Sequence, residues 1–173
     1  MMNTHTPFEA AVQAHGATVL RVCRAVLGPH ADADDAWSET FLSAMPAWPK
    51  LPESTNVEAW LVRIAHRKAI DVTRRRARQA VPVEHLPETP AAAGSQGRSQ
   101  SDARSAERHE LWSAVGDLPE KQRKAIAYRY LGSLPYDDIA ELLGGTAAAA
   151  RRSAADGLQS LRRHPAFRDH DGA

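Results

Sequence analysis

Residues 57–78, VEAWLVRIAHRKAIDVTRRRAR, are the stretch around which the rest of the sequence is organised. Its apolar side chains recur at the spacing of one helical face, which predicts an amphipathic helix; they are Trp60, Leu61, Ile64, Ala65 and Val72. Another side of the same helix is basic and carries Arg63, Arg67, Arg74 and Arg78. Such a face is either solvated surface or a surface that binds phosphates, because clustered guanidinium groups release counterions from nucleic acid.

The composition favours a helical protein without disulfides. The chain has 173 residues and a formal net charge of only +1, so the basic cluster is local, and the sequence is rich in Ala and Arg. Cys23 is the only cysteine, which suits a reducing compartment. No apolar run approaches the ~20 residues that cross a bilayer, and the N-terminus lacks a signal-peptide pattern. We therefore expect an all-α cytoplasmic protein that does not insert into membranes.

A first helix is expected upstream of the basic one. Apolar residues recur at helical spacing from Phe8 to Val26, and Gly28-Pro29 should end the helix. His15 lies on this stripe. His15 is better explained as a packed, hydrogen-bonded side chain than as a ligand-binding residue.

A second helix should follow, with Asp32 or Asp34 as its N-cap. Its apolar side is formed by Trp37, Phe41, Ala44 and Met45. Pro46 should end or kink the helix, and residues 46–56, PAWPKLPESTN, should be a loop.

Carboxylates crowd this second helix: Asp32, Asp34, Asp35 and Glu39. They lack the spacing and the turn glycine of a calcium loop, and no His or Cys stands at ligand spacing. The helix dipole alone explains acidic residues in a first turn. No metal site is therefore expected.

The chain should contain two small helical domains, residues 1–80 and 105–173. Between them, residues 81–104 are rich in Pro, Ala, Gly, Ser and Gln without apolar periodicity, which is typical of a flexible linker. The second domain should end in a short C-terminal tail.

The second domain contains a helix-turn-helix pattern. A short helix over residues 136–143 is followed by the turn Gly144-Gly145-Thr146 and a longer helix from Ala147 to about Arg163. The second helix of such a pair enters the major groove with its N-terminal residues, here Thr146, Ala148, Arg151 and Arg152. A plain helical bundle would show a similar pattern, so both interpretations remain open.

Three stretches together resemble a known family: DADDAWSETFLSAM (residues 32–45), AWLVRIAHRKAIDVTRRRAR (59–78) and LPEKQRKAIAYRYLGSLPYDDIAELLGG (118–145). In this order they resemble bacterial RNA polymerase sigma factors of the extracytoplasmic-function group of the sigma-70 family. The resemblance implies a region 2 domain that binds the β′ clamp helices and melts the minus-ten element. It also implies a region 4 domain that binds the β flap and reads the minus-thirty-five element.

Carried over by position, the resemblance assigns three sets of residues. The β′ clamp helices would meet Asp35, Ser38, Glu39 and Met45. The opened minus-ten strand would meet Ser54, Arg63, His66, Arg67, Arg74 and Arg75. The minus-thirty-five element would meet Thr146, Ala148, Arg151 and Arg152.

Three departures from the family bear on these assignments. Relatives often have Gln where Ser38 stands and Asn where Arg67 stands. Their recognition helix usually carries more hydroxyl and basic residues than the Ala-rich start of this one, so the sequence does not reveal the minus-thirty-five preference.

The sequence thus predicts a non-catalytic sigma factor that binds core RNA polymerase and directs promoter recognition. It is expected to be a monomer when free, to need no cofactor, and to have an anti-sigma factor as a possible partner. The alternative is a stand-alone helix-turn-helix regulator with an N-terminal dimerisation or sensing module. An enzyme is not supported, because the sequence contains no P-loop, Gly-rich dinucleotide turn, nucleophile elbow or paired histidines at metal spacing.

Overall fold

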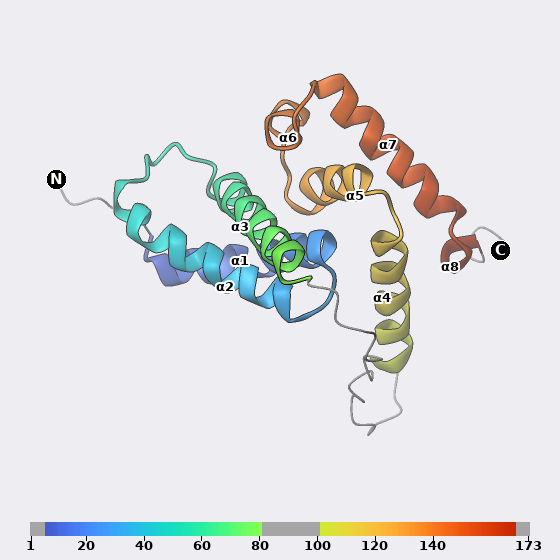
Figure 1. Cartoon of the computed structure of the whole chain (residues 1–173). Helices are drawn as coiled ribbons and strands as arrows, with labels where there is room; N and C mark the ends of the chain where they lie inside the picture. Colours follow the sequence, from blue (N-terminus) through green and yellow to red (C-terminus); the bar gives the residue numbers. More distant parts are fainter. Residues whose placement is uncertain (1–5, 81–100, 169–173) are drawn as a thin grey trace.

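The computed structural model describes residues 6–80 and 101–168, and all regular elements within these ranges are helices (Figure 1). This confirms the expected all-α fold. The first bundle consists of α1 (Phe8–Leu27), α2 (Ala31–Ala44), the 3₁₀ helix η1 (Met45–Lys50) and α3 (Val57–Gln79). The second consists of α4 (Ser101–Gly116), α5 (Glu120–Ile126), the π-helix η2 (Ala127–Leu131), α6 (Tyr136–Leu143), α7 (Ala147–Arg163) and α8 (Pro165–Arg168).

The expected linker, residues 81–104, lies mostly outside the described residues. Its last part is helical, because α4 begins at Ser101 rather than near Ser105.

Local signals place the helix ends in the first bundle. Gly28, with φ 91°, ends α1, and its N–H donates to the carbonyl of Arg24 at 2.8 Å. The Asn56 side chain caps α3 by accepting from the N–H of Ala59 at 3.1 Å. The expected acidic cap of α2 is wrong: the N-cap is His30, because the chain is extended there and already turns helical at Ala31.

The proline-rich stretch after α2 is more regular than expected. Residues Met45–Lys50 form a 3₁₀ helix rather than a loop, since Pro46 stands in its first turn, where a missing N–H costs no hydrogen bond. Within it, Trp48 is buried and its indole N–H donates to the carbonyl of Thr6 at 3.1 Å. The ring also lies edge-on to Phe8, with the ring centroids 5.5 Å apart. This segment therefore closes one end of the bundle.

The sequence predicts that Ile126 and Tyr130 are both buried in the second bundle, and for Tyr130 this prediction is wrong. Tyr130 is 53% exposed, whereas Tyr128 is completely buried. The helix formed by α5 and η2 is covered on two sides: Ile126 packs toward α7, and Tyr128 packs toward the first bundle. Periodicity within one bundle identifies only the first of these sides.

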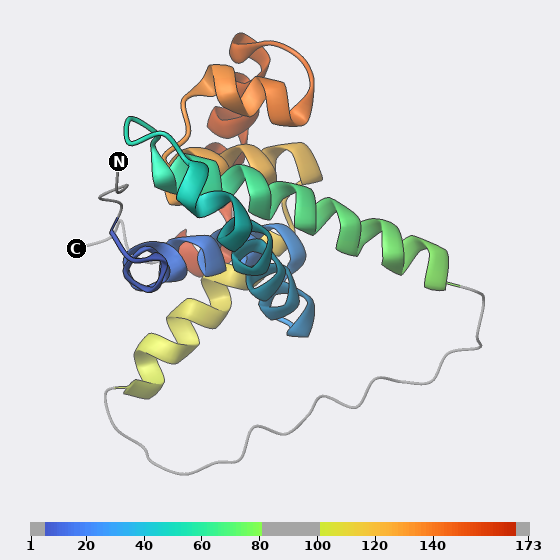
Figure 2. The same ribbon diagram turned by 90° about the vertical axis from the view of Figure 1, so that its left-hand side faces the viewer.

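The two bundles lie against each other (Figure 2), and they share one hydrophobic cluster. Val19 of α1 and Val62 of α3 belong to the same cluster as Ala127, Tyr128 and Leu134 of the second bundle. At Gly132 the backbone comes so near α3 that an added Cβ would lie 3.0 Å from Cγ1 of Val62. The second bundle therefore packs directly on α1 and α3.

Gly157, in the middle of α7, is expected to be required for packing. A Cβ there would lie 2.5 Å from Cδ1 of the buried Ile126. Gly157→Ala should lower the free energy of unfolding, because overpacking costs ~1–3 kcal/mol and the gain in helix propensity is about 1 kcal/mol. Thermal unfolding followed by circular dichroism measures the change.

Gly116→Ala is the matched control, since a Cβ at Gly116 would meet nothing within 4 Å. It should be neutral or stabilising. Equal stability changes in the two variants would contradict the packing role of Gly157.

Candidate nucleic-acid interface

Arg67 and Arg74, two of the expected minus-ten residues, lie on the exposed part of the basic face of α3. Ser54, in the loop that leads into the helix, is also exposed. These three expected minus-ten residues are therefore accessible to a ligand.

Other cations of α3 are paired with acidic residues of α2. Glu39 forms ion pairs with Lys68 and Arg75, with N–O distances of 3.6 and 3.9 Å, and Arg76 pairs with Asp32. Such partly exposed pairs contribute little to stability, with a median of about 0–1 kcal/mol. They do orient Glu39 toward α3. A substitution of Glu39 by a cation would consequently disturb α3 as well as any partner surface.

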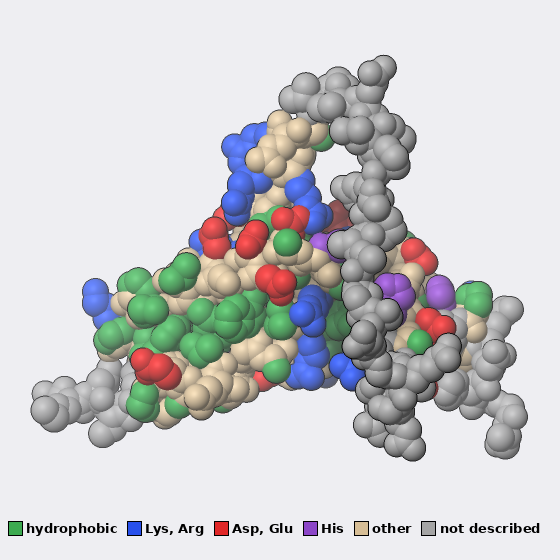
Figure 3. Space-filling model, turned by 90° about the horizontal axis from the view of Figure 1, so that it is seen from below, with side chains coloured by type: hydrophobic (Ala, Val, Ile, Leu, Met, Phe, Trp, Pro, Cys, Tyr) green, Lys and Arg blue, Asp and Glu red, His purple; other side chains and the backbone are tan. Residues whose placement is uncertain are grey.

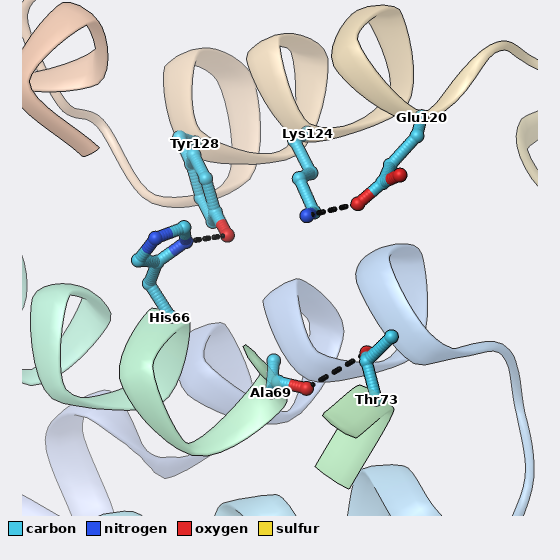
Figure 4. A network of polar contacts seen from close by, with 6 residues as sticks. All are labelled: His66, Ala69, Thr73, Glu120, Lys124 and Tyr128. Carbon is cyan, nitrogen blue, oxygen red and sulfur yellow. Dashed lines mark hydrogen bonds and ion pairs between the residues drawn. The ribbon is translucent and has the colours of Figure 1, made fainter. Parts of the chain in front are cut away.

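Two further residues expected at the minus-ten strand face the second bundle. Arg63 pairs with Asp138 of α6 at 2.8 Å. His66 is only 5% exposed, and its Nδ1 is hydrogen-bonded to the hydroxyl of Tyr128 at 2.5 Å (Figure 4). Burial, followed by the charge of Lys124, lowers the pKa of His66 from 6.5 to about 4. The imidazole is therefore neutral at pH 7 in this arrangement.

The start of α7 presents the expected recognition residues. Thr146 is the N-cap and its hydroxyl accepts from the N–H of Ala149 at 3.1 Å. Ala148, Arg151 and Arg152 are exposed within the first two turns, and positions three and four apart share a helical face. The structure thus brings the four residues together at one end of the helix.

Sequence reasoning missed two residues beside this site. The guanidinium carbon of Arg151 lies 5.1 Å from the ring centroid of Tyr136, and that of Arg129 lies 4.8 Å from the same ring. Cation–π contact with a common ring holds both cations near the start of α7. No spacing rule within one helix indicates this, because Arg129, Tyr136 and Arg151 belong to three different elements.

A third surface is an apolar groove between α1 and α2, with a volume of about 550 Å³. Its lining residues are Phe8, Glu9, Val12, Gln13, Trp37, Ser38, Phe41, Leu42 and Met45. Figure 3 shows hydrophobic side chains gathered in a band on this part of the molecule. The groove includes Ser38 and Met45 but not Asp35 or Glu39, so the expected polymerase-binding residues divide into two groups.

Leu42 is the residue that sequence reasoning missed in this groove. It is 66% exposed, more than Met45 at 51%. Its position off the apolar stripe of α2 is the signal that could have identified it, because an exposed leucine beside a groove is typical of an interaction surface.

Comparison with known proteins identifies the family. Residues 11–79 match Sigma-70 region 2, and residues 108–161 match Sigma-70 region 4. The chain belongs to the sigma-70 family. The region 2 match ends with α3, and the region 4 match extends from within α4 to near the end of α7. We use these names for the two bundles.

The relatives place this sigma-70 chain in the extracytoplasmic-function group. It is 30% identical over 155 residues to the ECF RNA polymerase sigma factor SigE of Mycolicibacterium smegmatis, covering 87% of this chain and 58% of the relative. It is 24% identical over 164 residues to the RNA polymerase sigma-E factor of Streptomyces coelicolor, covering 95% and 89% of the two chains. The chain thus spans little more than half the length of the SigE relative.

Solved structures share the fold. One is the sigma factor RpoE in complex with the anti-sigma factor NepR from Bartonella quintana, with a TM-score of 0.66 and 19% identity, covering 90% of this chain and 94% of that one. Another is CnrH in complex with the cytosolic domain of CnrY, with a TM-score of 0.60 and 23% identity, covering 95% and 89%.

The described parts of regions 2 and 4 lack two kinds of feature. No group of His, Cys, Asp and Glu side chains there could hold a metal ion. No helix among the described residues has the length and apolar character of a membrane span.

Proposed function

We propose that this chain is a sigma factor that binds core RNA polymerase and directs it to promoters. The match to region 2 and region 4 in one chain, in that order, carries the proposal. A polymerase subunit of this kind needs one surface for the enzyme and two for DNA. The groove, α3 and the start of α7 supply three separate surfaces.

The groove between α1 and α2 is proposed to receive the β′ clamp helices, with Leu42 and Met45 as apolar anchors and Ser38 at its edge. Exposed apolar side chains in a groove are the usual anchors for a partner helix. Asp35, which is exposed outside the groove, would steer a basic partner surface rather than anchor it. Glu39 would contribute less, because it is paired with α3.

The basic side of α3 and the loop at Ser54 are proposed to hold the opened minus-ten strand. Separating stacked bases costs a few kcal/mol, which contacts with phosphates and extruded bases offset. The start of α7 would read the minus-thirty-five element through Arg151 and Arg152, and Thr146 and Ala148 would allow close approach of the backbone. Region 4 would also contact the β flap.

The remaining properties follow from this role. We propose a cytoplasmic, non-catalytic protein without a cofactor, monomeric when free. An anti-sigma factor is a proposed partner, because the similar RpoE is bound to one in its solved structure.

Run-off transcription tests the proposal. Core polymerase with the full chain should start transcripts at defined promoters in genomic DNA fragments, and core polymerase alone should not. Sequence-specific binding to DNA in the absence of core polymerase, without any transcript in its presence, would instead identify a stand-alone helix-turn-helix regulator.

A further inference from the structure

Region 4 is docked on one face of α3. Val62 lies under the backbone at Gly132, and Arg63 pairs with Asp138. His66 is hydrogen-bonded to Tyr128. Positions 62, 63 and 66 are three and four apart, so they share a side of the helix. The contact thus runs along one helical face for a full turn.

This is also the face proposed to hold the minus-ten strand. Arg63 and His66 are two of the residues assigned to that strand, and both are engaged by region 4. Tyr128 and His66 are fully or almost fully buried, so a base cannot reach them without displacing region 4. Arg67 and Arg74, farther along the helix, remain exposed.

His66 makes two polar contacts in the buried contact between regions 2 and 4. Its Nδ1 is hydrogen-bonded to the Tyr128 hydroxyl, and the ring also bonds the backbone of Leu142, a contact that by itself raises the pKa of the ring but less than burial lowers it. A neutral imidazole has one donor and one acceptor nitrogen, which suits this pair of partners. A protonated ring would turn Nδ1 into a donor and leave the Tyr128 hydroxyl proton without its acceptor.

The charges around His66 also oppose protonation. Lys124 of α5 and Arg67 of α3 both act on it as cations, and Arg63 lies one turn away. The carboxylates nearby are already paired: Asp138 pairs with Arg63. Glu120 pairs with Lys124, as Figure 4 shows. On the α1 side, burial raises the pKa of the Cys23 thiol to about 12, so that group stays uncharged.

We propose that region 4 is a built-in cover over the promoter-melting face of α3, and that falling pH opens it through protonation of His66. That the covered face of α3 melts promoter DNA rests on the proposed function. That acid opens the contact between region 4 and α3 does not. Burial lowers the pKa of His66 in the closed form to about 4, whereas a solvated histidine has a pKa near 6.5. The closed form therefore binds fewer protons than the open form.

The sign of the effect follows from this difference. Above about pH 6.5 the ring is neutral in both forms and the cover has its full stability. As pH falls from there toward 4, the open form takes up a proton and is favoured. Linkage then gives an increase of about tenfold in the ratio of open to closed chains between pH 7.5 and pH 5.5.

Energy transfer between two dyes on the full chain measures opening. Ser43→Cys on α2 and Gln159→Cys on α7 provide exposed labelling sites in regions 2 and 4. Cys23, the only native cysteine, is 1% exposed and should not react. Transfer should fall as pH is lowered from 7.5 to about 5, with the helical circular dichroism signal unchanged.

His66→Gln is the decisive variant, because an amide can accept and donate like the neutral ring but does not titrate in this range. It should stay closed and lose the pH response. Tyr128→Phe, which removes only the hydroxyl, should open more than the wild type at pH 7.5, and so tests the cover independently. Asp138→Asn should also open more, whereas the exposed neighbour Asp137→Asn should not.

A pH response that persists in His66→Gln, or a wild-type chain that stays closed until it unfolds, would overturn the proposal. The proposal would also be overturned if Tyr128→Phe and Asp138→Asn showed the same energy transfer, and so the same degree of closure, as the wild type. None of these readouts needs polymerase or promoter DNA. Failure of the cover is therefore distinguishable from failure of the sigma-factor assignment, which run-off transcription tests separately.

Discussion

Leu42→Glu combined with Met45→Glu is expected to abolish promoter-dependent transcription while leaving the fold intact. Both side chains line the groove between α1 and α2 and are mostly exposed, 66% and 51%. Exposed substitutions usually change stability by no more than about 0.5 kcal/mol. In a complex, however, the two carboxylates would be buried without partners, which costs several kcal/mol.

Holoenzyme formation should weaken by about a hundredfold or more, since each 1.4 kcal/mol is a factor of ten. Titration of labelled chain with core polymerase, followed by fluorescence anisotropy, measures this affinity. Ser43→Glu is the matched control, because Ser43 is exposed on the same helix but does not line the groove. Wild-type affinity in the double variant would show that core polymerase binds elsewhere.

Arg151→Ala combined with Arg152→Ala should weaken holoenzyme binding at a minus-thirty-five site. Both guanidinium groups are exposed in the second turn of α7, and Arg151 is held over the ring of Tyr136. Each lost bidentate contact with a base edge should cost about 1–3 kcal/mol. If both contacts are of this kind, the double variant is therefore expected to lose about 2–6 kcal/mol, which is roughly 30-fold to roughly 20,000-fold in affinity.

The salt dependence separates base recognition from phosphate binding. If the two arginines contact only phosphates, affinity should fall equally for all sequences and the salt slope should decrease. Arg162→Ala with Arg163→Ala is the control, because these arginines are exposed at the opposite end of the same helix. An equal loss in both double variants would mean that the start of α7 has no special role at the promoter.

The ends of the helices could be predicted because the signals that set them are local. The expected start of α3 at Val57 and the limits of α6 and α7 agree with the structure. Periodicity, glycine turns and a capping side chain act within a few residues. The N-cap of α2 was predicted wrongly because several acidic residues near the start of the helix were possible caps. In the structure the helix begins at Ala31, so His30 is the N-cap.

The sequence predicts less well which site residues are paired or buried, because pairing and burial depend on contacts between elements that are distant in the sequence. Glu39 lies half-buried on the acidic side of α2, where it is paired with cations of α3. Tyr128 lies on the side of its helix that one bundle alone would leave solvated. Only the docking of region 4 on region 2 buries it, and nothing in the spacing of either domain specifies that contact.

Because regions 2 and 4 share a hydrophobic cluster, any other ligand of the covered face of α3 must compete with region 4 of the same chain. Parts of one chain meet at an effective concentration that is typically on the order of millimolar. Dilution therefore leaves their contact unchanged, and a separate DNA strand at micromolar concentration would be outcompeted by roughly a thousandfold. A strand that polymerase already holds at the promoter has a comparable local concentration. Intramolecular docking would thus favour DNA delivered by the holoenzyme over single strands elsewhere in the cell.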